Sequence, residues 1–411
     1  MISGSASPAD GRIPDIPLRV AVICPIVVQH DAISAAAVDT YRALANDPRF
    51  DVVLLTWCND FPEIKARIVQ GGVADMLLDP AFLRADMLVY HFGIYAELID
   101  ALLVGNGHAI QAVYFHNITP AAIVPAADRP VIERSFRQMS NLAHADEVWP
   151  VSPVNAQELI DRDFDQSRLH IIPLSVEGPR LLDLEGKPAK PIEILFVGRL
   201  VPSKGVLDLV RGMARIRQRL RVPVRIRIVG NERFSDRAYI AAVRAEIAAL
   251  EGDLSVELLG TVDDQRLHDL YLSSHVFAIP SYHEGFCKTV VEALRAGCIP
   301  VGYAAHNLPN VVGGLGRLTA AGDIDALGEA MLDVVNGTAA ALDAPEQPHL
   351  HLDRGRMSLR EFDREAKRHV DAFTFRRFAE TTCERILALC QGRRRRALKP
   401  AASSLIIESA S

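Results

Sequence analysis

The segment Ser281–Pro300, SYHEGFCKTVVEALRAGCIP, holds two carboxylates whose spacing could serve ligand binding. Glu284 and Glu292 are separated by a glycine-containing turn and the start of a helix-like run, VVEALRAG. A helix that begins near Lys288 or Thr289 would present free backbone N–H groups, which favour an anion. The two carboxylates could then hold two ends of one ligand, such as two sugar hydroxyl groups, with an anion between them. An ordinary helix with one solvated glutamate is the alternative interpretation of this spacing.

The segment Phe196–Gly205, FVGRLVPSKG, places two cations directly after a buried strand. We expect Arg199 and Lys204 to lie at the carboxyl end of the first strand of the second half, where open α/β sheets bind ligands. A planar guanidinium and a compact ammonium facing a helix N-terminus suit a diphosphate. Two solvated loop cations are the alternative.

Short apolar runs alternate with longer amphipathic runs along the whole chain, a pattern typical of parallel sheets covered by helices. It predicts an α/β fold with two doubly wound domains that face each other across a cleft. Strands are expected at Leu18–Ile23, Val52–Thr56, Met87–Tyr90, Ala112–Phe115, Val148–Val151, Glu193–Val197, Arg225–Val229, Val256–Leu259, Val276–Ile279 and Ile299–Val301. Helices are expected at Ala32–Ala45, Ala96–Leu103 and Phe373–Leu389, and Thr338–His369 is expected to be an irregular insertion.

The domain organisation follows from changes in composition along the chain. We expect a disordered N-terminus over residues 1–16, a first domain over 17–176 and a second domain over 192–392 with a closing helix. The stretch 177–191, EGPRLLDLEGKPAKP, is rich in Gly, Pro and charge and is interpreted as a linker. Residues 393–411 are expected to form a basic, disordered tail.

Composition narrows the class of protein. The chain of 411 residues carries 45 Lys and Arg against 51 Asp and Glu, a net charge of −6, which argues against a nucleic-acid partner. The six cysteines form no C-x-x-C pair, and together with the absence of a signal peptide they predict reduced thiols and a cytoplasmic location. No apolar run is long enough to span a membrane. The run Arg393–Arg396 could contact anionic lipid at the inner face of the membrane, or stay solvated.

Four motifs follow one another in a specific order: FVGRLVPSKG, RIRIVGN, VELLGTV and SYHEGFCKTVVEALRAGCIPV. In that order and spacing they resemble a retaining glycosyltransferase of family four, and the resemblance is strongest from Glu193 to Gly316. It implies the GT-B fold, in which two Rossmann-like domains face each other. It also implies an acceptor site in the first domain and a nucleotide-sugar site in the second.

The resemblance implies a role for each matching position of the second domain. Arg199 and Lys204 would bind the donor diphosphate, Glu292 the ribose hydroxyls and Glu284 the transferred sugar. Thr289 stands where the family often has proline, and the role of Lys288 is open. The donor site would also include Gly198, Gly205, Asn231, Gly285, Phe286, Cys287, Lys288, Thr289 and Val290.

The first domain carries YFHNITP at Tyr114–Pro120, which resembles one branch of the family. Many members of that branch build bacterial surface polysaccharides, often from GDP-mannose. His116 would contact the donor sugar in a catalytic role, although a buried histidine of the core is the alternative. Candidates for the acceptor side are His91, Asn117, Gln29 and Asp31, with His30 and Ser34 beside them in the first loop.

The implied partners are a nucleotide-sugar donor, either GDP-mannose or a UDP-sugar, and a glycan or lipid-linked acceptor. No cofactor and no metal are expected, because in this family arginine and lysine replace the cation. Three alternatives stay open: a UDP-sugar-dependent transferase with another acceptor, a non-catalytic nucleotide-sugar-binding subunit of a polysaccharide assembly complex, and a sugar-nucleotide 2-epimerase or phosphorylase with the same two-domain fold.

Overall fold

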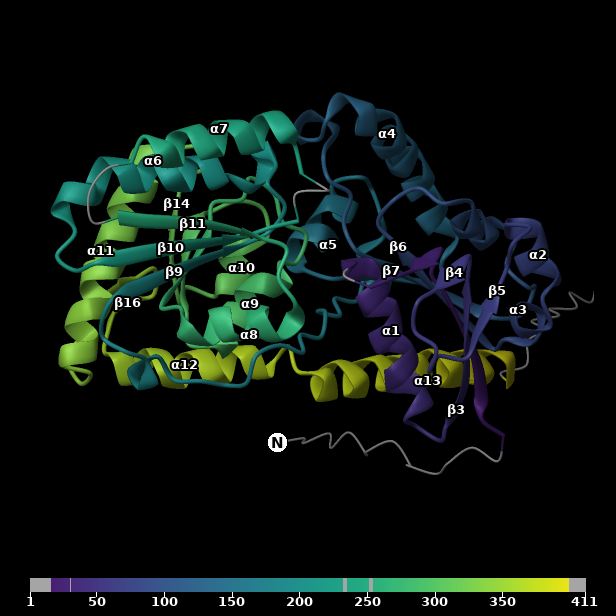
Figure 1. Cartoon of the computed structure of the whole chain (residues 1–411). Helices are drawn as coiled ribbons and strands as arrows, with labels where there is room; N and C mark the ends of the chain where they lie inside the picture. The colour runs from purple at the N-terminus through teal and green to yellow at the C-terminus, as the bar shows by residue number, and fades with distance from the viewer. Residues whose placement is uncertain (1–15, 30, 232–234, 251–253, 399–411) are drawn as a thin grey trace, which may run out of the picture.

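The computed structural model describes residues 16–29, 31–231, 235–250 and 254–398. The chain forms two α/β domains that lie side by side, each built on a six-stranded sheet (Figure 1). The strand order is β5-β3-β1-β6-β7-β8 in the first sheet and β11-β10-β9-β12-β13-β14 in the second. Neighbouring strands in both sheets run parallel. The predicted pair of doubly wound Rossmann-like domains is therefore confirmed.

Most central strands of the two sheets are largely apolar because helices cover both faces of each sheet, whereas β10 carries the half-buried Arg225 and Arg227. All six residues of β6 are buried, for example. The first sheet comprises β1 (Leu18–Ile23), β3 (Phe50–Thr56), β5 (Ala66–Ile68), β6 (Met87–Phe92), β7 (Ile110–Phe115) and β8 (Glu147–Pro150). Its helices are α1 (Ala32–Ala45), α2 (Val73–Leu78), α3 (Pro80–Arg84), α4 (Arg129–Gln138) and α5 (Pro153–Ile160), and a small ribbon pairs β2 (Ile26–Val27) with β4 (Cys58–Asn59). The stretch Glu97–Leu103, expected within a helix, is a 3₁₀ helix.

The second domain repeats this plan. Its sheet comprises β9 (Ile192–Val197), β10 (Val224–Val229), β11 (Leu254–Gly260), β12 (Val276–Ile279), β13 (Ile299–Tyr303) and β14 (Arg317–Thr319). The helices are α6 (Val206–Ile216), α7 (Arg237–Ala248), α8 (Asp264–Ser273), α9 (Lys288–Arg295), α10 (Leu308–Val312), α11 (Ile324–Asp343), α12 (Leu359–Asp371) and α13 (Phe375–Leu398). Beside α11, an antiparallel hairpin joins β15 (Leu350–Leu352) to β16 (Gly355–Met357).

Two expectations for the C-terminal part of the chain were wrong. The stretch Thr338–His369 is not irregular: it contains the end of α11, the β15–β16 hairpin and most of α12. A capping box starts α12, since Ser358 and Glu361 each bond the backbone N–H of the other. The closing helix does not end at Leu389, because α13 continues to Leu398. The first residues of the expected disordered tail are therefore helical, whereas residues 399–411 and residues 1–15 lie outside the described residues.

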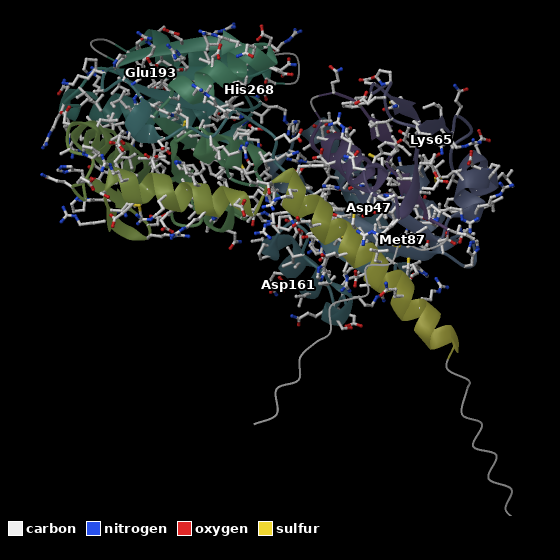
Figure 2. The ribbon with its side chains drawn as sticks, turned by 90° about the horizontal axis from the view of Figure 1, so that it is seen from below. Asp47, Lys65, Met87, Asp161, Glu193 and His268 are labelled. Carbon is white, nitrogen blue, oxygen red and sulfur yellow. The ribbon has the colours of Figure 1, made fainter. Side chains whose placement is uncertain are left out.

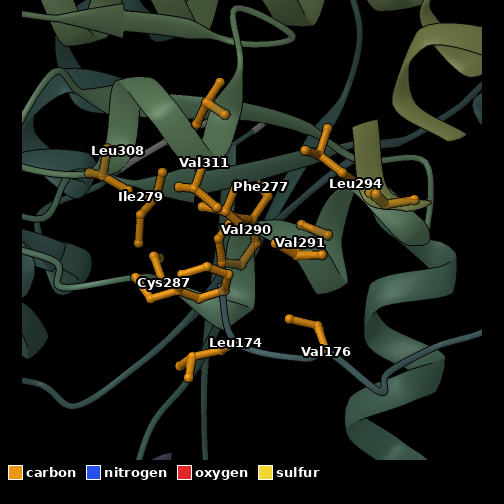
Figure 3. Close-up of a cluster of buried hydrophobic side chains, with 14 of the residues drawn as sticks. Leu174, Val176, Phe277, Ile279, Cys287, Val290, Val291, Leu294, Leu308 and Val311 are labelled. Carbon is orange, nitrogen blue, oxygen red and sulfur yellow. The ribbon is translucent and has the colours of Figure 1, made fainter. Parts of the chain in front are cut away.

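The chain passes between the two domains twice. The first passage contains Leu174 and Val176, which pack against Val290 and Val291 of α9 within one buried apolar cluster (Figure 3). The second passage joins α12, beneath the second domain, to α13, which crosses back beneath the first (Figures 1 and 2). A backbone hydrogen bond of 2.8 Å from Val176 to Phe373 ties the two passages together. Further along the predicted linker, Leu184 is fully buried, so part of that stretch is packed into the fold.

A buried ion pair fastens α13 to the first sheet. Arg385 of α13 donates two hydrogen bonds to Glu147 of β8, one of them at 2.7 Å, and Trp149 Nε1 donates a third at 2.7 Å. The Glu147 side chain is only 5% exposed. Arg385→Met should therefore lower the free energy of unfolding by about 3 kcal/mol, because it leaves a buried carboxylate without its cation.

Urea denaturation of the whole chain measures this effect, and Arg377→Met on the same helix provides the control. The Arg377–Asp371 pair is exposed, at 54% and 50%, and its loss should cost less than about 1 kcal/mol. Equal effects of the two substitutions would show that the Arg385 contact does not anchor the helix.

Candidate functional site

Lys204 and Glu284, which are far apart in the sequence, form an ion pair with 2.6 Å between Nζ and Oε1. Lys204 ends a 3₁₀ turn, Pro202–Lys204, that follows β9, and Glu284 lies in the loop that follows β12. Since β9 and β12 are neighbours in the sheet, their carboxyl ends bring these two loops together. The two side chains are only 20% and 12% exposed. The structure thus joins two of the residues predicted for the donor site.

Gly205 allows the Lys204 turn to rest on the end of β12. Its backbone φ is +67°, and a Cβ atom at this position would lie 2.0 Å from the carbonyl oxygen of Pro280. The turn is also bonded to the facing loop, because the Tyr282 amide donates to the Ser203 carbonyl oxygen at 2.9 Å. The tight approach of the two loops holds Lys204 beside Glu284.

Helix α9 begins at Lys288, as the sequence predicted. Cys287 precedes it with a φ of +75° and makes no side-chain capping hydrogen bond to the helix. The free N–H groups of the first turn suit an anion close to the Glu284 loop. Phe286, Cys287 and Val290 are buried, so their side chains belong to the core and only their backbone groups could serve a ligand. Thr289 Oγ1 lies 3.3 Å from Cys287 Sγ.

Glu292 lies one turn further into α9, close to the first passage between the domains. The Tyr271 hydroxyl donates to Glu292 Oε2 at 2.9 Å, and a Cβ atom on Gly178 would lie 3.0 Å from Glu292 Cγ. Burial raises the pKa of Glu292, although the bond from Tyr271 and the charge of Lys288 oppose that shift. Sequence reasoning missed Tyr271, because nothing in its own segment distinguishes it from a core residue of α8.

Three rings stack at the carboxyl ends of β6 and β7. The ring centroids of His91, Tyr114 and His116 form a triangle, with 5.2 Å from His91 to Tyr114, 5.0 Å from Tyr114 to His116 and 5.1 Å from His91 to His116. The two imidazoles also meet directly, with His91 Nδ1 2.9 Å from His116 Nε2. Burial lowers the pKa of His91 to about 3 and the pKa of His116 well below its usual range, so both rings are neutral at physiological pH. His116 can therefore act through hydrogen bonds but not through charge.

Asn117 and Gly285 bring the two domains into direct contact. A Cβ atom on Gly285 would lie 2.7 Å from Asn117 Cβ and 3.0 Å from the His116 carbonyl oxygen. The Asn117 side chain also reaches the ring of His283, with 3.0 Å between Nδ2 and Nε2. Sequence reasoning assigned no role to His283, although it directly precedes Glu284 in the motif.

The first loop contributes to helix capping. Asp31 Oδ2 accepts hydrogen bonds of 2.7 Å from both the amide and the hydroxyl of Ser34, and so caps α1. The backbone N–H of Gln29 donates to Asp60 Oδ2 at 3.3 Å. These bonds give Asp31 and Ser34 a structural role, and the assignment of the first loop to the acceptor side stays a prediction. His30 lies outside the described residues.

Lys288 makes a charged contact between the domains. Its Nζ lies 3.9 Å from Asp39 Oδ2 of α1, and Asp39 also accepts a 2.5 Å hydrogen bond from Ser175. Both charged side chains are largely buried, at 22% and 11% exposure, so Lys288 is not a surface cation.

The remaining predicted donor residues lie at the ends of β9 and β10. Arg199 is exposed, and the Gly198 amide donates to the Val229 carbonyl oxygen at 3.0 Å. The Asn231 carbonyl oxygen accepts from Ser235 at 2.8 Å. The Gly198 bond ties the carboxyl ends of β9 and β10 together on the side where Lys204 lies.

Within the described ranges, no three His, Cys, Asp or Glu side chains gather as metal ligands would. None of the helices in the same part of the chain has the length and apolar character to cross a membrane.

Comparison with known proteins bears on this geometry. Residues 182–347, which include Arg199, Lys204, Glu284 and Glu292, match the family model described as glycosyl transferases group 1. The second domain is similar to group 1 glycosyl transferases. The MMP alpha-(1->4)-mannosyltransferase of Mycolicibacterium hassiacum is 26% identical over 351 residues, which cover 80% of this chain and 76% of that protein. The O-antigen chain mannosyltransferase B of Escherichia coli is 29% identical over 133 residues, which cover 32% of this chain and 34% of that protein.

Solved structures show the same fold. Sucrose-phosphate synthase from Thermosynechococcus elongatus has a TM-score of 0.66 at 18% identity, covering 92% of this chain and 100% of that chain. Anabaena HepE in complex with UDP-glucose has a TM-score of 0.64 at 16% identity, covering 90% and 99%. These neighbours are GT-B glycosyltransferases, and the predicted GT-B fold is confirmed. The family match and the names of the relatives support a glycosyltransferase.

Proposed function

We propose that this protein is a retaining glycosyltransferase that transfers a hexose, preferably mannose, from a nucleotide diphosphate sugar to a glycan or lipid-linked acceptor. The contact between Lys204 and Glu284 beside the first turn of α9 carries the proposal. It combines a cation, a set of free N–H groups and a carboxylate in one place. A sugar diphosphate presents the matching groups, since its phosphates are anionic and its sugar carries hydroxyls.

Transfer breaks the bond between the anomeric carbon and the phosphate oxygen and forms a bond to the acceptor oxygen. Negative charge then grows on the leaving diphosphate, where Lys204, Arg199 and the start of α9 would stabilise it. The described site offers no evident protein nucleophile near Glu284, so we propose that the acceptor attacks the face that the diphosphate leaves. The acceptor proton passes to a phosphate oxygen. His116, being neutral, would orient the sugar through a hydrogen bond.

The identity of the sugar and the setting rest on resemblance. Two relatives are named as mannosyltransferases, and one of them as an O-antigen chain enzyme. We therefore favour GDP-mannose and bacterial surface polysaccharide or exopolysaccharide synthesis. The UDP-glucose bound to HepE supports a UDP-sugar as the alternative donor. The proposed location is the cytoplasm, with peripheral contact to the membrane through Arg393–Arg396. No metal is part of the proposal, and turnover in EDTA tests that point.

Thermal unfolding with a panel of nucleotides and nucleotide sugars should identify one nucleotide series that stabilises the protein. At 100 times its Kd, a specific ligand adds about 2.7 kcal/mol to the free energy of unfolding. Glu292→Ala should abolish that gain, because it removes the carboxylate expected to hold the ribose. Glu329→Ala, at an exposed glutamate paired with Arg219, is the matched control and should respond like the wild type.

If nucleotides stabilised Glu292→Ala as much as the wild type, Glu292 would not be part of the nucleotide site. A wild type that no nucleotide stabilises would count against the transferase itself. Binding without sugar transfer to any acceptor would favour a non-catalytic nucleotide-sugar-binding subunit.

A further inference from the structure

The segments HNITP and HEGFC, which are far apart in the sequence, are the two sides of one contact between the domains. Asn117, from the loop after β7, lies against His283 and Gly285, from the loop after β12. Asn117 Nδ2 is 3.0 Å and Asn117 Oδ1 is 3.3 Å from His283 Nε2. Glu284 directly follows His283, and His283 contacts Asn117 of the first domain.

The backbone at this contact is specialised on both sides. Asn117 adopts a φ of +94°, in the left-handed region that asparagine tolerates better than most residues that have a Cβ atom. Gly285 has no room for a side chain, since a Cβ atom would lie 2.7 Å from Asn117 Cβ. A strained conformation persists only where the surrounding structure holds it in place, so the contact with the His283 loop helps to fix Asn117.

His283 relays the contact to the backbone of Glu284. Burial, together with the nearby His306 and Lys204, lowers the pKa of His283 to about 3, so the ring is neutral. In the tautomer that carries its proton on Nδ1, Nε2 accepts a hydrogen bond from Asn117 Nδ2. The ring of His283 lies 4.0 Å from the ring of His306, centroid to centroid. His306 Nδ1 in turn lies 2.7 Å from the Glu284 carbonyl oxygen. The series ends at the Glu284 side chain, which contacts Lys204 at 2.6 Å.

We propose that His283 is a positioning residue, which uses its hydrogen bond to Asn117 of the first domain to set Glu284 for the transferred sugar. The inference rests on the proposed function and adds a residue that acts through Glu284 without touching the donor. Binding of the nucleotide alone, through Arg199, Lys204 and Glu292, does not need this contact. Recognition of the sugar and transfer of the sugar both require the contact between Asn117 and His283.

The test uses two variants that remove one partner each. Asn117→Gly deletes the amide while glycine accepts the positive φ, and His283→Phe keeps the ring beside His306 but removes the acceptor nitrogen. Each variant should bind the free nucleoside diphosphate with a Kd within about twofold of the wild type, yet lose about tenfold to a hundredfold in kcat. The extra thermal stabilisation that the nucleotide sugar gives over the nucleotide should disappear. His283→Gln, which retains an acceptor, should recover part of the kcat.

Controls and coupling separate positioning from general damage. Asp163→Gly relieves another positive φ, of +64°, and His351→Phe alters a half-buried histidine of the β15–β16 hairpin; both should match the wild type. The double variant Asn117→Gly/His283→Phe should lose no more than either single variant, because both remove the same contact.

Three other results would overturn either the positioning role of His283 or the proposed function. Wild-type kcat and sugar response in both variants would eliminate the positioning role. Equal loss of nucleotide and nucleotide-sugar binding would show collapse of the loop and would likewise overturn it. A wild type that binds no nucleotide would instead overturn the proposed function.

Discussion

Lys204→Met should lower kcat for sugar transfer by a factor of about 100 to 1000, which is the range found when one preorganised charge-stabilising donor is removed. The Nζ of Lys204 lies 2.6 Å from Glu284, and the Lys204 side chain is only 20% exposed, so water poorly replaces its charge. Without it, the charge that grows on the leaving diphosphate loses a cation. Steady-state kinetics with the donor found by thermal unfolding measure the effect.

The matched control is Lys65→Met, at a lysine that is 67% exposed in the first domain and should leave kcat unchanged. Arg199→Ala should also lower kcat, because we assign it to the same diphosphate. If both Lys204→Met and Arg199→Ala turned over at the wild-type rate, the diphosphate site would have to lie elsewhere.

Gly205→Ala should destabilise the fold by at least about 3 kcal/mol and abolish transfer. An alanine at a φ of +67° costs about 1 to 2 kcal/mol through backbone strain alone. Its Cβ would in addition lie 2.0 Å from the Pro280 carbonyl oxygen, so the turn that carries Lys204 must move away from β12. Urea denaturation and kcat report the two consequences separately.

Gly107→Ala separates the cost of a positive φ from the cost of the steric clash with Pro280. Gly107 has a φ of +84°, and a Cβ atom there would approach none of the described residues outside its own chain neighbours to within 4 Å. Alanine at this position should therefore cost only the backbone strain. Equal destabilisation at the two glycines would mean that the Lys204 turn tolerates displacement, and the link between that turn and activity would fail.

The central strands of both sheets could be predicted from the sequence, because most of them are compact apolar runs. Leu18–Ile23 and Val276–Ile279 match β1 and β12 residue for residue. The edge strands β5 and β14 were missed: with one neighbour each, their residues are half-buried or exposed and carry no apolar run. Helix α12 was missed because its many charges mask the four buried apolar residues Leu359, Phe362, Ala366 and Val370, which follow helical spacing.

The residues of the candidate site also fall into those that the sequence predicts and those that it does not. Lys204 and Glu284 could be expected to meet, since each follows a strand and the carboxyl ends of neighbouring parallel strands share one edge. Tyr271, Asp39 and His283 could not be assigned, because their partners come from distant segments whose packing a single sequence does not reveal. The start of α9 was predictable, whereas the contact of Lys288 with another domain was not.

The return of α13 to the first domain has a consequence for how the chain is made. Cys383 lies 3.6 Å from the Ala43 carbonyl oxygen of α1, and Arg385 neutralises Glu147 of β8. A ribosome delivers the first domain long before it delivers these residues. While the second domain is being synthesised, α1 therefore exposes an apolar face, and Glu147 lacks its ion-pair partner Arg385. The nascent first domain must persist in this incomplete form, and its final stability depends on α13, which is made after the second domain.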